Sequence, residues 1–163
     1  AFTTLGEELA HVETYIRIQK LRFGDRINYQ VNTEDEDIKK YAILPLLLQP
    51  IVENSIIHGL WGDEREGHIA INIFRDNVNA LLVIEIRDNG EGIDGEALKK
   101  LKYDIEHSEV GRTGSIGLYN INRRVKLHYG EEYGIKIRSK TGEGTAVILT
   151  IPLEILKNDS NLI

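Results

Sequence analysis

The chain has 163 residues, 41% of them hydrophobic and 28% charged, which suits one soluble domain with a buried core and is too short for two. Its formal net charge of −6 argues against a nucleic-acid binder, because such proteins carry a basic excess. The absence of cysteine excludes disulfides and thiolate zinc sites, and the longest apolar run is far too short to span a membrane.

The first half of the chain predicts two helices separated by a strand and a loop. Apolar spacing favours a helix over Thr3 to Arg22, a strand over Ile27 to Val31, a polar loop over Asn32 to Lys40 and a helix over Leu44 to Leu60. Pro45 suits the first turn of the second helix. Pro50 lies inside the same helix, where we expect it to bend the helix or to leave a carbonyl free.

The second half predicts two β-hairpins and a third helix. Alternating apolar residues indicate strands at His68 to Phe74, Ala80 to Arg87, Tyr133 to Ser139 and Thr145 to Ile151. A short helical stretch falls within Asp94 to His107, and Ile116 to Tyr129 predicts a longer helix. We therefore expect an α+β fold, a two-layer sandwich with helices on one face of a mixed, mostly antiparallel sheet.

The segment from Gln49 to Gly59 carries the first chemical motif. Asn54 and His58 are four residues apart and share one helix face. The amide oxygen of an asparagine is a hard, neutral ligand that suits Mg²⁺, which also takes phosphate oxygens. Glu53 lies about 100° around the helix and flanks this face.

A second motif runs from Asp88 to Ile93 and follows a predicted strand. A carboxylate at a strand end can accept a hydrogen bond from the exocyclic amine of adenine, whereas guanine presents an oxygen there. Gly90 and Gly92 allow the backbone to turn tightly beside a flat base.

Glycine-rich segments make up the remaining motifs. Gly111 to Leu118 opens a predicted helix, where free N–H groups and the helix dipole favour a phosphate chain, and Arg112 offers a charge-assisted contact. Gly142 to Thr145 is weaker, with a hydroxyl at Thr145 that can hold the base edge or a water beside it. Each motif alone is compatible with an ordinary turn, loop or exposed helix residue, so the prediction depends on all of them occurring together in this order.

Together the motifs resemble the ATP-binding domain of the autolysin-sensor-like family of bacterial sensor histidine kinases, within the gyrase–chaperone–kinase–MutL ATPase superfamily. Residues 46–59 are similar to the N-box of the family, residues 88–93 to its G1 box, residues 114–118 to its G2 box and residues 142–145 to its last glycine motif. Flanking segments also match, at Glu7-Glu8-Leu9, Tyr15 to Gln19, Arg22-Phe23, Asn120-Ile121 and Arg123-Arg124. The resemblance covers Leu5 to Leu153.

The resemblance implies a Bergerat-type α/β sandwich that holds ATP and Mg²⁺ beneath a mobile lid over Asp94 to Ser115. It assigns Mg²⁺ coordination to Asn54 and adenine recognition to Asp88. It also implies nucleotide contacts at the following residues: His58, Gly90, Gly92, Ile93, Arg112, Gly114, Gly117, Leu118 and Thr145.

Two departures from the family pattern bear on the chemistry. Ile57 stands where the family commonly has a lysine before the histidine, so a cationic phosphate contact is missing or is replaced by Arg112 or Lys126. Pro50 stands where hydrolytic members of the superfamily have a glutamate, which argues against a rapid ATPase. Glu53 has two open roles: it orients an incoming acceptor imidazole, or it takes part in a local hydrogen-bond network with Gln49. Glu53 and Asn54 are thus the predicted catalytic residues.

A kinase of this type also needs a histidine as phosphate acceptor. His11 lies on the first predicted helix, but its neighbours lack the acceptor surroundings of the family. Because the chain begins at Ala1 without a methionine, we expect a fragment whose acceptor precedes it. Residues 1–25 would then link to an acceptor-helix domain, residues 26–153 form the catalytic domain and residues 154–163 a flexible tail.

The predicted function is transfer of the ATP γ-phosphate to a histidine outside this chain. The expected partners are the acceptor-helix domain of the same or the dimer-mate chain and the receiver domain of a response regulator, with no nucleic acid. We expect a cytoplasmic domain of a membrane-anchored homodimer. Two alternatives stay open: a regulatory nucleotide-binding module without transfer activity, and a serine kinase of the anti-sigma type.

Overall fold

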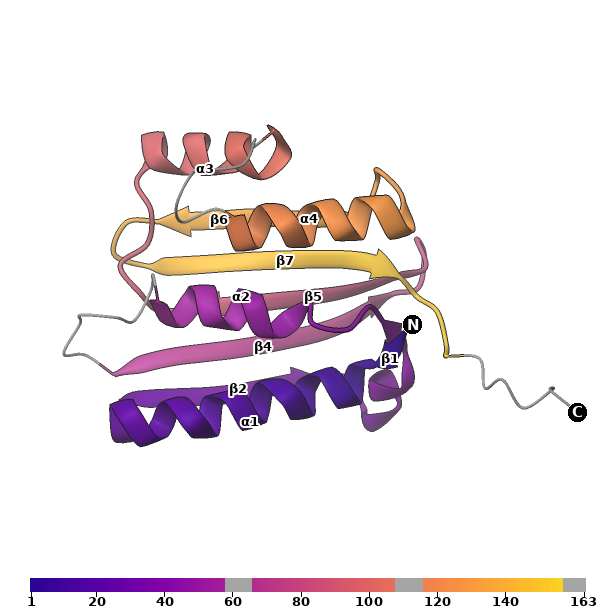
Figure 1. Ribbon diagram of the computed structural model, residues 1–163, viewed down its shortest axis with the longest axis horizontal. Coiled ribbons are helices and arrows are strands. Elements are labelled where there is room, and N and C mark those ends of the chain that lie inside the picture. The colour runs from indigo at the N-terminus through magenta and orange to yellow at the C-terminus, as the bar shows by residue number, and fades with distance from the viewer. Residues whose placement is uncertain (58–65, 108–115, 157–163) are drawn as a thin grey trace, which may run out of the picture.

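The computed structural model describes residues 1–57, 66–107 and 116–156, which form two short strands and a five-stranded sheet with helices (Figure 1). The helices are α1 (Leu5–Phe23), α2 (Leu48–Ser55), α3 (Gly95–His107) and α4 (Ile116–Tyr129), with short 3-10 helices at Gly24–Arg26 and Glu36–Lys40. The strands are β1 (Thr3–Thr4), β2 (Ile27–Thr33), β3 (Ala42–Ile43), β4 (Gly67–Asp76), β5 (Leu81–Asp88), β6 (Gly134–Lys140) and β7 (Gly144–Pro152).

The sheet has the strand order β2-β4-β5-β7-β6. Strand β2 runs parallel to β4, and the other neighbouring strands run antiparallel. Figure 1 shows α2 between α1 and α4, and all three lie on the same side of the sheet. The predicted two-layer sandwich on a mixed, mostly antiparallel sheet is therefore confirmed.

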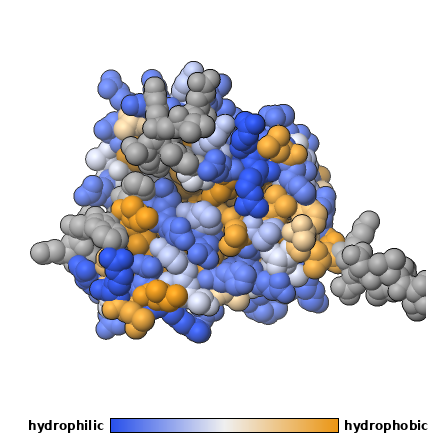
Figure 2. Space-filling model, in the orientation of Figure 1, coloured by the Kyte–Doolittle hydropathy of each residue, from blue (hydrophilic) through white to orange (hydrophobic). Residues whose placement is uncertain are grey.

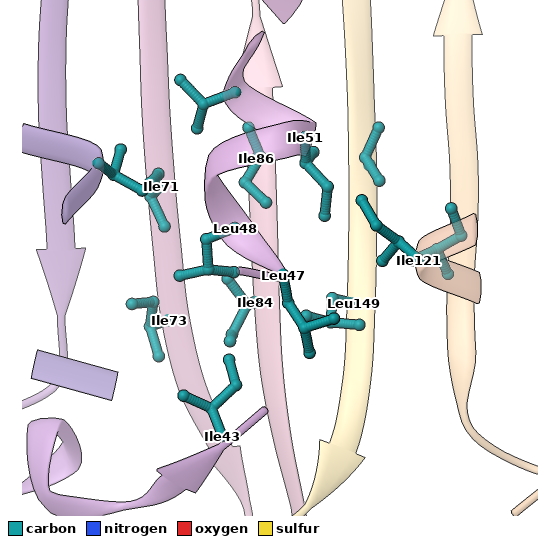
Figure 3. Packing of buried hydrophobic residues seen from close by; sticks show 14 of the residues in the cluster. Ile43, Leu47, Leu48, Ile51, Ile71, Ile73, Ile84, Ile86, Ile121 and Leu149 are labelled. Atoms are coloured by element: carbon teal, nitrogen blue, oxygen red, sulfur yellow. The ribbon is translucent and has the colours of Figure 1, made fainter. Parts of the chain in front are cut away.

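The core fills the space between these two layers. Alternate residues of β4 and β5 face the helices, so Ile71, Ile73, Ile84 and Ile86 are almost completely buried. Side chains from α2 and the segment before it pack onto this row (Figure 3), with Leu47, Leu48 and Ile51 inaccessible to solvent. The helix α1 adds Leu5, Leu9, Val12 and Ile16 to the same cluster. The position of α2 over the sheet is thus set by hydrophobic burial.

Hydrophobic residues that remain accessible are dispersed. Figure 2 shows the helix-bearing face as small hydrophobic groups separated by hydrophilic residues. Such scattered exposure is normal for a soluble domain. Among the described residues, no helix combines the length and the apolar character that crossing a membrane requires.

The structure differs from the predictions in the second helix. The α-helix begins at Leu48 rather than Leu44, so Pro45 precedes it in a turn. Pro50 consequently lies in the first helical turn, where an amide has no partner within the helix. We expected Pro50 to bend the helix or to leave a carbonyl free. A proline costs little in the first turn, and the Leu46 carbonyl, four residues before it, accepts a hydrogen bond from Arg124.

Candidate nucleotide site

The predicted site residues gather at one end of the sandwich. The C-terminal end of α2, the end of β5, the start of β7 and the N-terminal end of α4 all lie at the left of Figure 1. Asp88 is the last residue of β5, and Thr145 of β7 is its direct partner in the sheet register. Hydrophobic burial of α2 and pairing of β5 with β7 therefore bring the first, second and last motifs together.

The carboxylate of Asp88 is the chemical centre of this end. Asp88 is only 5% exposed, on the helix-facing side of the sheet. It accepts hydrogen bonds from the Gly90 amide at 2.9 Å, from the Thr145 amide and from the Ser55 hydroxyl. Burial raises the pKa of Asp88 above its ordinary value, and the three hydrogen bonds oppose this shift. The fold thus holds an aspartate at the end of a strand in surroundings that disfavour its charge.

Two glycines of the predicted motifs are required by close backbone contacts. Gly144 has φ +95°, and a β-carbon there would lie 2.0 Å from the carbonyl oxygen of Asp88. Gly92 has φ +74°, and a β-carbon there would lie 2.1 Å from the carbonyl oxygen of Lys140. The segment after β5 therefore lies directly against the β6–β7 hairpin, and only glycine permits this approach.

Ser139 joins the same segments and was not predicted. Its hydroxyl accepts a hydrogen bond from the Ile93 amide at 2.8 Å. The same oxygen lies 2.9 Å from the Gly144 carbonyl and 2.8 Å from the hydroxyl of Thr145. A sequence signal was available, since Ser139 occupies the inward-facing position that follows the buried Ile135 and Ile137 in β6.

Asn89, between Asp88 and Gly90, has a structural role. Its side-chain oxygen accepts from the His68 amide at 2.7 Å, and its amide group donates to the Glu66 carbonyl at 3.0 Å. These bonds tie the end of β5 to the start of β4. The motif therefore combines a buried carboxylate with a clamp on the neighbouring strand.

The helix α2 presents Asn54 at this end of the sandwich. Asn54 is partly buried, and within the described residues its amide group takes part in no hydrogen bond. Within the same part of the chain, no cluster of three histidine or acidic residues could hold a metal by itself. A single neutral amide oxygen fits Mg²⁺ only where phosphates and water complete the coordination, as they do around a nucleotide. The donor set thus fits a metal that arrives with ATP.

Glu53 is engaged with its own helix. The Gln49 amide group donates to its carboxylate at 3.0 Å. This contact is one of the two roles that the sequence left open for Glu53. Ser55 follows Asn54 in α2 and reaches Asp88, so the predicted metal ligand and the residue that contacts the predicted base-reading carboxylate share one helix.

The first turn of α4 carries two of the predicted nucleotide contacts. Gly117 is exposed in its first turn, whereas the side chain of Leu118 is buried in the core. Lys126 donates to the Glu131 carbonyl at 2.8 Å, and it lies toward the other end of α4. Lys126 is therefore not placed to replace the missing lysine. The predicted contacts His58, Arg112 and Gly114 lie outside the described residues.

Comparisons with known proteins agree with this arrangement. The family described as histidine kinase-, DNA gyrase B-, and HSP90-like ATPase matches residues 41–155. The sensor histidine kinase YesM of Bacillus subtilis is 37% identical over 149 residues, which are 91% of this chain and 24% of that protein. The sensor protein LytS of Bacillus anthracis is 32% identical over 151 residues, which are 93% of this chain and 25% of that protein. The chain thus spans about a quarter of the length of these relatives.

Solved structures share the fold. The catalytic domain of the histidine kinase ThkA superposes with a TM-score of 0.68 at 17% identity, covering 94% of this chain and 95% of that one. The structure of ThkA in complex with the response regulator protein TrrA gives a TM-score of 0.65 at 16% identity, covering 94% and 41% of the two chains. The resemblance to the autolysin-sensor-like kinases is confirmed by the relatives, and the chain belongs to the histidine kinase-, DNA gyrase B-, and HSP90-like ATPase family.

Proposed function

We propose that this domain binds ATP with Mg²⁺ and passes the γ-phosphate to a histidine outside the chain, as the catalytic domain of a sensor histidine kinase. The observation that carries the proposal is the buried carboxylate of Asp88, with α2 and the glycine-containing segments arranged around it. The sensor histidine kinases among its relatives support the same reaction.

Asp88 would select the base. An ionised carboxylate only accepts hydrogen bonds, and it has lone pairs beyond those used by the Ser55 hydroxyl and the Gly90 and Thr145 amides. The exocyclic amine of adenine can donate to it, whereas guanine would place an oxygen against a buried acceptor. An unpaired buried polar group is costly, so this residue would favour ATP over GTP.

Asn54 and the first turn of α4 would hold the phosphates. Mg²⁺ would neutralise charge that develops on the transferred phosphoryl group. Asn54 would supply an oxygen ligand for the metal. The exposed Gly117 lies in the first turn of α4, where amides without a partner in the helix and the helix dipole favour an anion. The predicted contacts at Gly90, Gly92, Ile93 and Leu118 belong to the same proposal.

Transfer is favoured over hydrolysis by the residues of α2. Pro50 cannot activate a water, and Glu53 is hydrogen-bonded to Gln49.

The histidines of the chain bear on where the phosphate acceptor lies. The ring of His107 stacks on Tyr103 at 4.5 Å, and the ring of His128 meets Phe2 edge-on at 5.0 Å. None of these ring contacts identifies an acceptor within the chain, and we propose that the acceptor lies on a separate helical domain.

The remaining predictions about the whole protein stand as proposals. The ThkA complex with TrrA supports a response regulator as the second partner. Residues 26–153 would be the catalytic domain, residues 1–25 would connect it to the acceptor helices, and residues 154–163 would form the tail. The complete protein would be a membrane-anchored homodimer with this domain in the cytoplasm.

Asp88→Asn tests the base assignment. We expect calorimetry to show ATP binding at least about tenfold weaker. The NH2 group of the new asparagine is a donor, and it would face the adenine amine and the groups that donate to Asp88. Asp76→Asn is the matched control, since Asp76 caps the exposed turn at the opposite end of the β4–β5 hairpin. Unchanged ATP affinity in Asp88→Asn would refute the adenine assignment. Asn54→Asp, tested in parallel, is expected to change the Mg²⁺ concentration needed for binding.

An exposed Ile57 favours a second candidate, a regulatory domain that binds ATP without transferring phosphate. A longer protein that includes the acceptor helices, incubated with labelled ATP, separates the alternatives. Acid-labile phosphohistidine is the result expected for the kinase. Bound ATP without label transfer would indicate the regulatory module, and acid-stable phosphate on a partner serine would indicate the anti-sigma-type kinase.

A further inference from the structure

The turn that leads into α2 contains a residue in an unfavourable conformation. Leu46 has φ +58°, and its side chain is 54% exposed. A bulky residue with a β-carbon is rarely found in this left-handed region. Such conformations persist only where the surrounding structure imposes them, and they are common where a backbone must be held for function.

Glu8 of α1 holds this turn from one side. It is 1% exposed, and its carboxylate accepts hydrogen bonds from the Leu46 amide at 2.6 Å and from the Leu48 amide at 3.4 Å. The residue at the N-cap of α2 is Leu47, whose side chain cannot accept a hydrogen bond. A buried glutamate from another helix therefore supplies the cap that α2 lacks.

Arg124 of α4 holds the turn from the other side. Its guanidinium donates to the Pro45 carbonyl at 2.9 Å and to the Leu46 carbonyl at 3.2 Å. Glu8 thus binds amides and Arg124 binds carbonyls of the same short segment. Figure 1 shows α2 between α1 and α4, which agrees with contacts to the turn from both helices.

We propose that Glu8 and Arg124 are positioning residues of the nucleotide site, an inference that rests on the proposed ATP-binding function. The helix α2 has eight residues and carries Asn54 and Ser55 at its far end. Because α2 has only about two turns, a shift of its first turn changes the position of Asn54, the proposed metal ligand, and of Ser55, whose hydroxyl binds Asp88. Arg124 ties this turn to α4, whose first turn carries Gly117. Asn54, the Ser55–Asp88 pair and Gly117 are thereby held at fixed positions relative to one another.

The first step of the test compares Glu8→Gln and Arg124→Met with Arg123→Met. Arg123 is the matched control because it is the neighbouring arginine on the exposed surface, and it contacts Tyr119. We expect ATP binding, measured by calorimetry well below the unfolding temperature, to weaken about tenfold in Glu8→Gln and Arg124→Met and to stay unchanged in Arg123→Met.

The second step is rescue by Leu46→Gly. Glycine adopts the left-handed conformation without a steric cost, so this change alone should raise the midpoint of thermal unfolding by about 2–4 °C. Combined with Glu8→Gln, it should restore most of the lost ATP affinity, because the turn no longer has to be forced. A merely structural role of Glu8 predicts no such recovery.

Amide hydrogen exchange in the absence of nucleotide distinguishes a failure of the positioning role from a failure of the proposed ATP-binding function. We expect faster exchange at the start of α2 in Glu8→Gln and slower exchange again in the double variant. Wild-type ATP affinity in both Glu8→Gln and Arg124→Met, or a double variant without recovery, would overturn the positioning role. A wild-type protein that binds no ATP would instead refute the proposed function, and the exchange experiment would still show whether the turn controls α2.

Discussion

Replacing Gly144 with alanine would place a methyl group where the backbone of β5 already lies. The added β-carbon would be 2.0 Å from the carbonyl oxygen of Asp88 and 2.9 Å from the α-carbon of Asn89. To reach an ordinary contact distance of 3.4 Å, the Asp88 carbonyl would have to retreat by about 1.4 Å. The paired ends of β5 and β7 cannot open by this amount without losing hydrogen bonds.

The loss of folding stability in Gly144→Ala has two contributions. A residue with a β-carbon at φ +95° costs about 1–2 kcal/mol, because this region is disfavoured for every residue except glycine. The collision adds about 1–3 kcal/mol, the usual range for overpacking in a tightly packed region. Gly144→Ala should therefore lower the free energy of unfolding by about 2–5 kcal/mol, a large share of the total for a domain of this size.

Gly142→Ala is the control for the backbone cost alone, without the collision. Gly142 has φ +83° in the same hairpin, but an added β-carbon there would meet no atom within 4 Å. Urea unfolding of the two variants should give a loss of about 1–2 kcal/mol for Gly142→Ala and a clearly larger loss for Gly144→Ala. Calorimetry of Gly144→Ala should show weaker ATP binding as well, since the Thr145 amide and the Asp88 carboxylate move apart.

Equal destabilisation by the two alanines would refute this reasoning. It would mean that the loop after β5 can move away from β7 without cost, so that the backbone contact does not fix Asp88. Retained ATP affinity in a folded Gly144→Ala protein would separately contradict the role given to the β5–β7 pairing in the base site.

The remaining predictions concern α2, α4 and α3. Gly117→Ala has room for its methyl group and lies in a helix, so it should raise the free energy of unfolding by up to about 1 kcal/mol, while calorimetry shows weaker ATP binding. Asn122→Ala removes a buried side chain that accepts from the Ile135 amide at 2.9 Å and donates to the Ile105 carbonyl at 3.4 Å; urea unfolding should show a loss of about 2–3 kcal/mol, with faster amide exchange in α3. Ser55→Ala removes a hydrogen bond that lowers the pKa of Asp88, so that pKa should rise further. A raised carboxyl pKa favours the folded state most below the ordinary value of 3.8, and this contribution is lost as the pH rises through the raised pKa. ATP binding requires the ionised Asp88 carboxylate, so ATP affinity should increase as the pH rises. Calorimetry across the acidic range should place the pH midpoint of this increase higher in Ser55→Ala than in the wild type. An unshifted midpoint would show that the Ser55 hydroxyl does not stabilise the Asp88 carboxylate.

Local sequence patterns predicted most of the elements. The helix over Ile116 to Tyr129 has the predicted ends, and the alternation in β4 and β5 identified a hairpin that the register confirms. These features are readable because helical and strand periodicities depend on neighbouring residues. The shortened α2 escaped such analysis, since the residues before it continue the apolar run but form a turn that Glu8 and Arg124 hold.

The sequence by itself determined the class of the domain, the order of its motifs and the identity of the carboxylate expected to read the base. It left two roles for Glu53, and it placed Ser139 on the inward face of a strand without showing what the hydroxyl binds, because both points depend on which side chains meet after folding. The tertiary structure decided these points through contacts between distant parts of the chain. Glu8 reaches Leu46 across 38 positions, and Ser139 reaches Ile93 across 46. No local period encodes such pairs, since they form only when burial of the apolar faces brings α1, α2, α4 and the sheet together.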